Sequence, residues 1–294
     1  MKTLIGKGRK MKYFFLAVLL FVASIQIIAQ DEKDIFLIVR ADDMASFHDA
    51  NVACIKACKE GIARSVEIMV PCAWFQEAVK MLNENPTIDV GIHLVLTSEW
   101  EGIKWRPLTY VPSLVDKDGY FFQFIWGGNN PSADNYLLKV NWRIEEIEKE
   151  FRAQIELAKK YLPQISHLSA HMGCTHMDPK VNELLEKLVK EYKLDTENIP
   201  GIKELKGWDN KNSLNKNIDQ FISNINSLVP GEYVFVEHPG LNNSEMHSAS
   251  FDKNNTLAFD RQMVTDIYTN EKVIKALHDK GIKLISYSDL FKKK

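Results

Sequence analysis

The stretch IFLIVRADD, residues 35–43, decides the fold, because an apolar run there ends in two acidic residues. Residues 35–40 predict a buried strand, since a short continuous apolar run is typical of a strand covered on both faces. Further strands are predicted at residues 65–70, 89–96, 165–170, 233–236 and 282–286, with a weaker one within 198–205. Strands that are apolar on both faces favour a parallel sheet wrapped by helices.

Helical patterns separate these strands. Apolar residues recur at spacings of three and four in the long segment 144–162, which marks one face of a helix. The other predicted helices are residues 49–60, 74–82, 179–192, 214–228 and 271–280. About seven strands, each generally followed by a helix, predict an α/β fold. No GxGxxG motif follows the first strand, so a (β/α) barrel fits better than a doubly wound dinucleotide-binding sheet.

Composition and charge narrow the class of protein. The chain has 294 residues, 45% hydrophobic and 26% charged, with a net charge of -2. These values exclude a disordered chain, a collagen and a disulfide-dense mini-protein. Near-neutral charge also argues against a nucleic-acid partner. The charge is unevenly spread, because residues 1–30 hold five basic residues and no acidic one, which leaves the remainder clearly acidic.

The basic start continues into an apolar run, YFFLAVLLFVASIQIIA, and then into a charged segment. This order is typical of a secretory signal peptide. We therefore expect residues 1–30 to be removed, and residues 31–294 to form a single exported domain, periplasmic or secreted. An uncleaved membrane anchor is the alternative. No later segment is long and apolar enough to span a membrane.

Titratable residues gather where the predicted strands end, which is where (β/α) barrels carry their working groups. Asp42 and Asp43 follow the first strand, and His93, His171 and His238 come from three others. One Asp and two His would form an open three-ligand metal site. A neighbouring carboxylate would serve as base and a further His as acid. Each residue also has a structural explanation, such as a helix cap, a core histidine or a turn.

Four segments in the expected order resemble the YdjC-like carbohydrate deacetylases: ADD (41–43), DVGIHLVLT (89–97), HLSAHMGCTH (167–176) and EHPG (237–240). The likeness runs from about residue 35 to the last predicted strand near residue 285, which is nearly the whole mature chain. It implies a distorted TIM-like (β/α) barrel and one divalent metal ion, zinc or magnesium. It also implies an enzyme that hydrolyses the N-acetyl amide bond of an amino sugar or a short N-acetylated oligosaccharide.

The resemblance also assigns roles by position. Asp43, His93 and His171 would be the metal ligands, Asp42 the base that activates water, and His238 the acid or the group that holds the acetamide.

Two motifs depart from the family pattern. Met44 and Ala45 stand where Phe and Gly are common, and Ser169 and Ala170 stand where Asp and Ser are common. The three metal positions are kept, so the chain resembles a divergent branch of the family.

The long connection 98–140 is rich in aromatic residues, which could stack on sugar rings or pack the loop onto the barrel. Trp100, Trp105 and Arg106 lie closest in sequence to His93 and are the predicted substrate contacts. The expected partner is a small carbohydrate, and a homodimer is left open. A glycoside hydrolase and a non-catalytic sugar-binding protein are the alternative functions.

Overall fold

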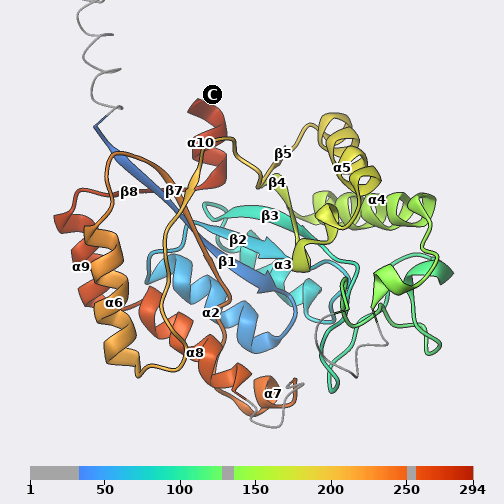
Figure 1. Cartoon of the computed structure of the whole chain (residues 1–294), viewed down its shortest axis with the longest axis horizontal. Helices are drawn as coiled ribbons and strands as arrows, with labels where there is room; N and C mark the ends of the chain where they lie inside the picture. Colours follow the sequence, from blue (N-terminus) through green and yellow to red (C-terminus); the bar gives the residue numbers. More distant parts are fainter. Residues whose placement is uncertain (1–32, 128–135, 250–255, 294) are drawn as a thin grey trace, which may run out of the picture.

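The computed structural model describes residues 33–127, 136–249 and 256–293, so the expected signal peptide lies outside the described residues. Its centre is a parallel sheet with the strand order β5-β4-β3-β2-β1-β7-β6, and β8 also pairs with β1 (Figure 1). The strands are β1 (Ile35–Met44), β2 (Ser65–Ile68), β3 (Asp89–Leu94), β4 (Ile165–Ala170), β5 (Asp195–Thr196), β6 (Lys203–Glu204), β7 (Gly231–Glu237) and β8 (Lys283–Ile285). The predicted α/β class and the distorted TIM-like barrel are confirmed. The barrel is open, because β5 and β6 end the sheet and do not pair with each other.

Helices cover the outer face of the sheet, with α6, α8 and α9 on one flank and α4 and α5 on the other (Figure 1). Their bounds are α2 (His48–Lys59), α3 (Phe75–Asn83), α4 (Ile144–Tyr161), α5 (Pro179–Tyr192), α6 (Leu214–Asn226), α7 (Ser244–His247), α8 (Leu257–Tyr268), α9 (Glu271–Asp279) and α10 (Tyr287–Lys293). The described residues also form short 3-10 helices, η1 (Pro112–Leu114), η2 (Leu137–Lys139) and η3 (His171–His176). Among the described residues, no helix is long and apolar enough to cross a membrane.

The helix α5 shows how local sequence sets an element's ends. Asp178 accepts a hydrogen bond from the Lys180 amide at 2.9 Å, and Pro179 takes the first helical position, where its missing N–H costs nothing. The helix ends at Lys193, whose backbone is left-handed. Within these ends, buried Val181 and Leu185 lie four residues apart on the face that meets the core.

The two faces of the sheet differ in chemistry. Leu37 and Val39 belong to the main apolar core, whereas Ile38 belongs to a small separate cluster with Tyr287 and Leu290 of α10. This alternation follows from the period of two along a strand. The inward face of the neighbouring strands is largely polar, with buried Ser65, Glu67, Asp89, His167 and Ser169. The barrel interior is therefore a polar network that leads to the ends of the strands.

The long connection 239–265, which follows β7, is partly helical. It holds α7 and the first part of α8, and Arg261 lies on α8. The weak strand expected within 198–205 appears as β6, with β5 just before it.

Candidate active site

The end of β1 brings two adjacent carboxylates into one cavity. In a regular strand, consecutive side chains point to opposite faces. Here the pairing of β1 with β2 shifts register between Ala41 and Met44, and Asp43 has a left-handed backbone with φ 64°. As a result, Asp42 and Asp43 both line the same cavity, and both are almost fully buried.

This cavity has a volume of 310 Å³ and lies beyond the carboxyl ends of β1, β3, β4 and β7. Strands, loops, the 3-10 helix η3 and the helix α8 contribute to its wall. The lining residues are Asp42, Asp43, His93, Glu99, Trp100, Phe124, Ala170, His171, Met172, His238, Leu257 and Arg261. The five titratable residues predicted from the strand ends are therefore brought together in a single cavity.

Three of these residues can hold a metal ion. One ligand atom from each of Asp43, His93 and His171 lies within 4.8 Å of the others. Asp43 Oδ1 is 3.2 Å from His171 Nδ1 and 3.6 Å from His93 Nε2. This oxygen is buried and has no well-aligned hydrogen bond from a described residue, which leaves a lone pair for a cation. A carboxylate with two imidazoles suits zinc, and the open side of the cavity leaves room for water and substrate.

The charges around Asp43 keep it ionised. Burial alone would raise the pKa of Asp43, but Arg261, His171 and His238 outweigh this and hold it well below the usual range. Arg261 Nη2 donates to Asp43 Oδ2 at 2.7 Å. Asp43 therefore stays a carboxylate, the form that binds a cation.

The pKa values of the two imidazoles in the candidate metal site shift in opposite directions. Burial, together with the nearby His171, lowers the pKa of His93 well below its ordinary value, so His93 is neutral. Burial would also lower the pKa of His171, but Glu99 and Asp43 outweigh it and raise the value to about 10. Glu99 Oε2 lies 3.1 Å from His171 Nε2. His171 would therefore release a proton when a cation binds between it and Asp43.

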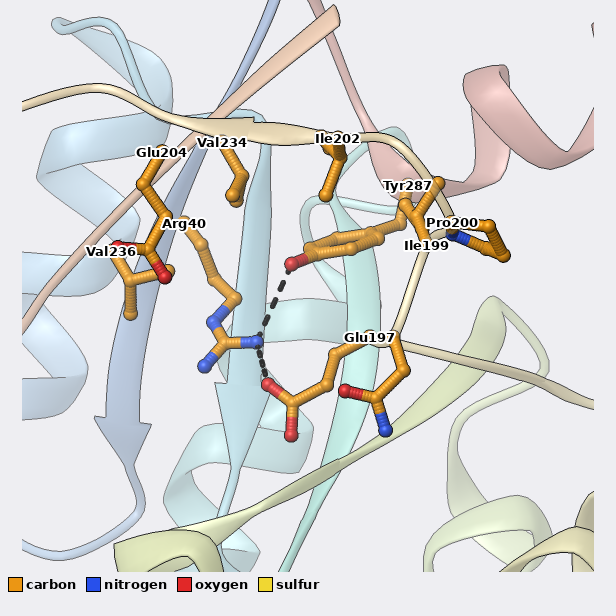
Figure 2. Close-up of a pocket in the computed structure, with 10 residues that line it drawn as sticks. Arg40, Glu197, Ile199, Pro200, Ile202, Glu204, Val234, Val236 and Tyr287 are labelled. Atoms are coloured by element: carbon orange, nitrogen blue, oxygen red, sulfur yellow. Dashed lines mark hydrogen bonds and ion pairs between the residues drawn. The ribbon is translucent and has the colours of Figure 1, made fainter.

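Asp42 is fixed by a buried arginine on its own strand. Arg40 Nη2 donates to Asp42 Oδ2 at 2.9 Å, and Arg40 Nε forms an ion pair with Asp42 Oδ1 at 2.6 Å. Figure 2 shows the far side of the same guanidinium, which contacts Glu197 and the Tyr287 hydroxyl at 2.5 and 3.4 Å. Asp42 Oδ2 then lies 3.8 Å from His93 Nε2, beside the candidate metal ligands.

Arg40 also separates the site from a second cavity. That cavity has a volume of 440 Å³ and lies between the β5–β6 connection, β7 and Tyr287 (Figure 2). Its polar wall includes Arg40, Glu197 and Glu204, and its apolar wall includes Ile199, Ile202 and Val234. We therefore regard it as the interior gap of the open barrel.

His238 stands at the open side of the site. Its side chain is 41% exposed, and Nε2 lies 4.0 Å from Asp43 Oδ2. Nδ1 lies 3.7 Å from Glu237 Oε2. Burial would lower the pKa of His238, but the Asp43 charge and the nearby Glu237 carboxylate outweigh it and raise the pKa. A partly exposed, readily protonated imidazole can deliver a proton to a molecule entering the cavity.

The three predicted substrate contacts lie in different places. Trp100 is buried in the cavity wall, and the Arg261 guanidinium lies 5.3 Å from its ring centre. Trp105 packs edge-on against Trp100 and donates its indole N–H to the Thr97 carbonyl at 2.7 Å. Arg106 lies over the Tyr120 ring and is outside the set of described cavity-lining residues.

Sequence reasoning missed two acidic residues that hold the site in place. Glu99 contacts His171 from the loop after β3, and Glu197 contacts Arg40 from the loop after β5. Glu197 Oε1 also accepts the Ala170 backbone N–H at 2.8 Å, next to His171. Neither residue lies at the end of a predicted strand, so no sequence pattern indicated them.

A family match and two similar proteins agree on the family to which this chain is related. The family of YdjC-like proteins matches residues 36–279. A carbohydrate deacetylase from Clostridium beijerinckii is 29% identical over 268 residues, which cover 86% of this chain and 99% of the relative. A chitooligosaccharide deacetylase from Yersinia enterocolitica is 31% identical over 159 residues, which cover 54% of this chain and 57% of the relative.

A solved structure shares the fold over nearly the whole length. It is a proposed cellobiose-phosphate cleavage protein from Enterococcus faecalis V583, with a TM-score of 0.70 and 22% identity. The likeness covers 87% of this chain and 99% of that chain. Together with the match over residues 36–279, these findings establish that the chain belongs to the YdjC-like protein family.

Proposed function

We propose that this chain is a metal-dependent deacetylase that hydrolyses the N-acetyl group of an amino sugar or a short N-acetylated oligosaccharide. The observation that carries the proposal is the meeting of Asp43, His93 and His171 within 4.8 Å beside a second buried carboxylate, Asp42. The names of the Clostridium beijerinckii and Yersinia enterocolitica relatives support a carbohydrate amide as the substrate.

Each residue has a role in this reaction. Asp43, His93 and His171 would hold the divalent cation. When bound, that cation supplies Lewis acidity to the acetyl carbonyl and to the attacking water. Asp42 accepts the proton of that water, because Arg40 keeps its carboxylate fixed beside His93. His238 donates a proton to the amide nitrogen as the C–N bond breaks, so acetate and a free amine leave the site.

The cavity suits one sugar residue near its mouth. Its polar end holds the candidate metal ligands, and Trp100, Phe124, Met172 and Leu257 add apolar surface. Apolar walls with a few convergent polar groups are typical of small-ligand sites. Aromatic and aliphatic side chains could then hold the ring while the acetamide group enters among the carboxylates and imidazoles.

The proposal is tested by incubating the purified protein with N-acetylglucosamine oligomers and added zinc or magnesium. We expect acetate release that stops when a chelator removes the metal. New reducing ends without acetate would instead support a glycoside hydrolase. Sugar binding that is unchanged by the chelator, with no product of either kind, would support a non-catalytic sugar-binding protein.

Export is part of the same proposal, and it is supported by the basic and apolar pattern of residues 1–30. Mass spectrometry of the protein recovered from the culture medium or periplasm should give an N-terminus close to residue 30. Full-length protein held in the membrane fraction would support an uncleaved anchor instead.

A further inference from the structure

Glu67 is a buried carboxylate in the barrel interior that the proposed reaction does not use. It lies on β2 between apolar Val66 and Ile68, and its side chain has no exposure to solvent. Burying a carboxylate is costly unless it is paired and hydrogen-bonded. Glu67 has two partners: His167 Nε2 lies 2.8 Å from Oε1, and the Ser169 hydroxyl donates to Oε2.

The strand register explains how Glu67 reaches residues two strands away. Glu67 pairs with Gly91, and Gly91 pairs with His167, so these three positions form one row across the sheet. His93 and Ser169 form the next row on the same face. Because Gly91 has no side chain, the Glu67 carboxylate passes over β3, and a Cβ atom at Gly91 would collide with Glu67 Oε2.

The protons along this chain of contacts can be assigned from chemistry. A serine hydroxyl has one proton, and an ionised carboxylate only accepts. The Ser169 hydroxyl therefore donates its hydrogen bond to Glu67. It accepts a hydrogen bond from His93 Nδ1, which lies 2.8 Å away. Nδ1 then carries the imidazole proton. The lone pair is left on Nε2, the atom that lies 3.6 Å from Asp43 Oδ1.

We infer that Glu67, acting through Ser169, is a positioning residue that fixes the tautomer and the ring orientation of His93 for a divalent cation. The inference rests on the proposed function in one respect, since it needs Asp43, His93 and His171 to be the metal ligands. A hydrogen bond to the far nitrogen of a ligating imidazole is a general means of orienting it. In this chain the carboxylate acts from β2, through a serine on β4.

The first test measures zinc affinity, with Zn²⁺ alone as the probe. Ser169→Ala interrupts the contact to His93, and we expect zinc to bind about 10- to 100-fold more weakly. Ser166→Ala is the matched control, because Ser166 lies on the same strand and contacts His167 Nδ1 at 2.8 Å but does not contact His93. The control should bind zinc as the wild type does. Equal affinities for Ser169→Ala and wild type would overturn the inference.

A double-mutant comparison tests whether Glu67 acts through Ser169. Glu67→Gln removes the charge that draws the serine proton, so it should weaken zinc binding in the wild type. In the Ser169→Ala background the same change should have little further effect, because the two residues act in series. Additive losses would overturn the role of Glu67 as the source of the effect.

A second readout does not depend on zinc or on catalysis. In the metal-free protein, nitrogen NMR of His93 should show a proton on Nδ1 in the wild type and a mixture of tautomers in Ser169→Ala. A wild-type imidazole protonated on Nε2 would overturn the inference, whatever the activity. If the tautomer and the zinc affinity behave as expected but no acetate is released, the proposed deacetylase function fails and the positioning role stands.

Discussion

Asp42 and Asp43 are adjacent in the chain, but two different arginines hold their carboxylates. Arg40 pairs with Asp42 at 2.6 Å, and Arg261 donates to Asp43 at 2.7 Å. The left-handed backbone of Asp43 turns both side chains into one cavity. The two carboxylates can therefore do different work: Asp43 faces the histidines that would share a metal ion, and Asp42 remains free to accept a proton.

Replacing Asp42 with Asn should separate turnover from binding. The amide cannot accept the proton of the attacking water, so we expect kcat to fall by about a hundredfold to ten-thousandfold. Zinc affinity should stay near that of the wild type, because Asp42 is outside the three-residue ligand set. Acetate release and zinc titration measure the two effects. Asp219→Asn, on the exposed side of α6, is the matched control and should change neither quantity. Full activity in Asp42→Asn would remove Asp42 from the reaction.

Arg40→Lys should lower kcat while leaving zinc affinity in place. Lysine keeps the charge but loses the planar fork that contacts Asp42 on one side and Glu197 on the other. Steady-state kinetics should therefore show about a tenfold or greater loss in kcat, since Asp42 loses its fixed orientation. Arg64→Lys is the control, because Arg64 donates only to the Gly61 and Ala63 carbonyls in the contacts described. If Arg40→Lys and Arg64→Lys have the same kcat, Arg40 does not position the base.

Ala45 stores backbone strain just after the two carboxylates. Its φ is 83°, a left-handed conformation that costs a residue with a Cβ about 1–2 kcal/mol. Ala45→Gly should raise the free energy of unfolding by up to about 1 kcal/mol, since glycine relieves the strain but gains entropy in the unfolded chain. Urea unfolding measures the change. Ala53→Gly, inside α2, should instead lower stability by about 1 kcal/mol. A loss of stability in Ala45→Gly equal to that in Ala53→Gly would contradict the strain.

The buried pair of Glu67 and His167 should make stability depend on pH. Burial would raise the pKa of Glu67, but the charge of His167 outweighs this effect. Burial would lower the pKa of His167, but the charge of Glu67 outweighs that effect. The pKa of Glu67 is therefore lowered from 4.5, and that of His167 is raised from 6.5. Stability from Glu67 is lost as the pH falls through its lowered pKa, and stability from His167 is lost as the pH rises through its raised pKa.

The consequence is a window in which the pair contributes fully, between about pH 4.5 and 6.5. His167→Gln should cost about 3–5 kcal/mol there, because it removes the positive charge that is paired with the buried Glu67 carboxylate. The difference from the wild type should shrink on both sides of this window. Urea unfolding of the metal-free proteins across the pH range measures it, and a difference that is constant with pH would refute the ion pair.

The strand ends were predictable because local pattern and topology agree there. The predicted strands 35–40, 89–96 and 165–170 have Asp42, His93 and His171 at or near their carboxyl ends, and parallel strands bring those residues to one edge. The helix at 179–192 was also predicted with its observed bounds, since Pro179 and the apolar spacing mark it locally. Asp43, His93 and His171 were brought together for the same reason.

Other parts of the site depend on long-range packing, which a single sequence does not display. Glu99, Glu197 and Arg261 reach the site from two loops and a helix, and their positions follow from how those segments cross the barrel mouth. Nearness in sequence to His93 did not decide which side chains line the cavity, because Trp100 lines it whereas Arg106 lies over the Tyr120 ring. Glu67 did carry a signal, since a charged residue inside the apolar run 65–70 indicates a buried partner.

The central claim is that water attacks the acetyl carbonyl of a sugar amide at the Asp42 and Asp43 site. The most direct test runs the zinc-loaded protein with N-acetylglucosamine oligomers in water enriched in heavy oxygen, and analyses all products by mass spectrometry. We expect acetate with one heavy oxygen atom, a sugar chain of unchanged length that has lost an acetyl group, and no such products from Asp42→Asn. Heavy oxygen at a new reducing end, with every acetyl group still in place, would contradict it.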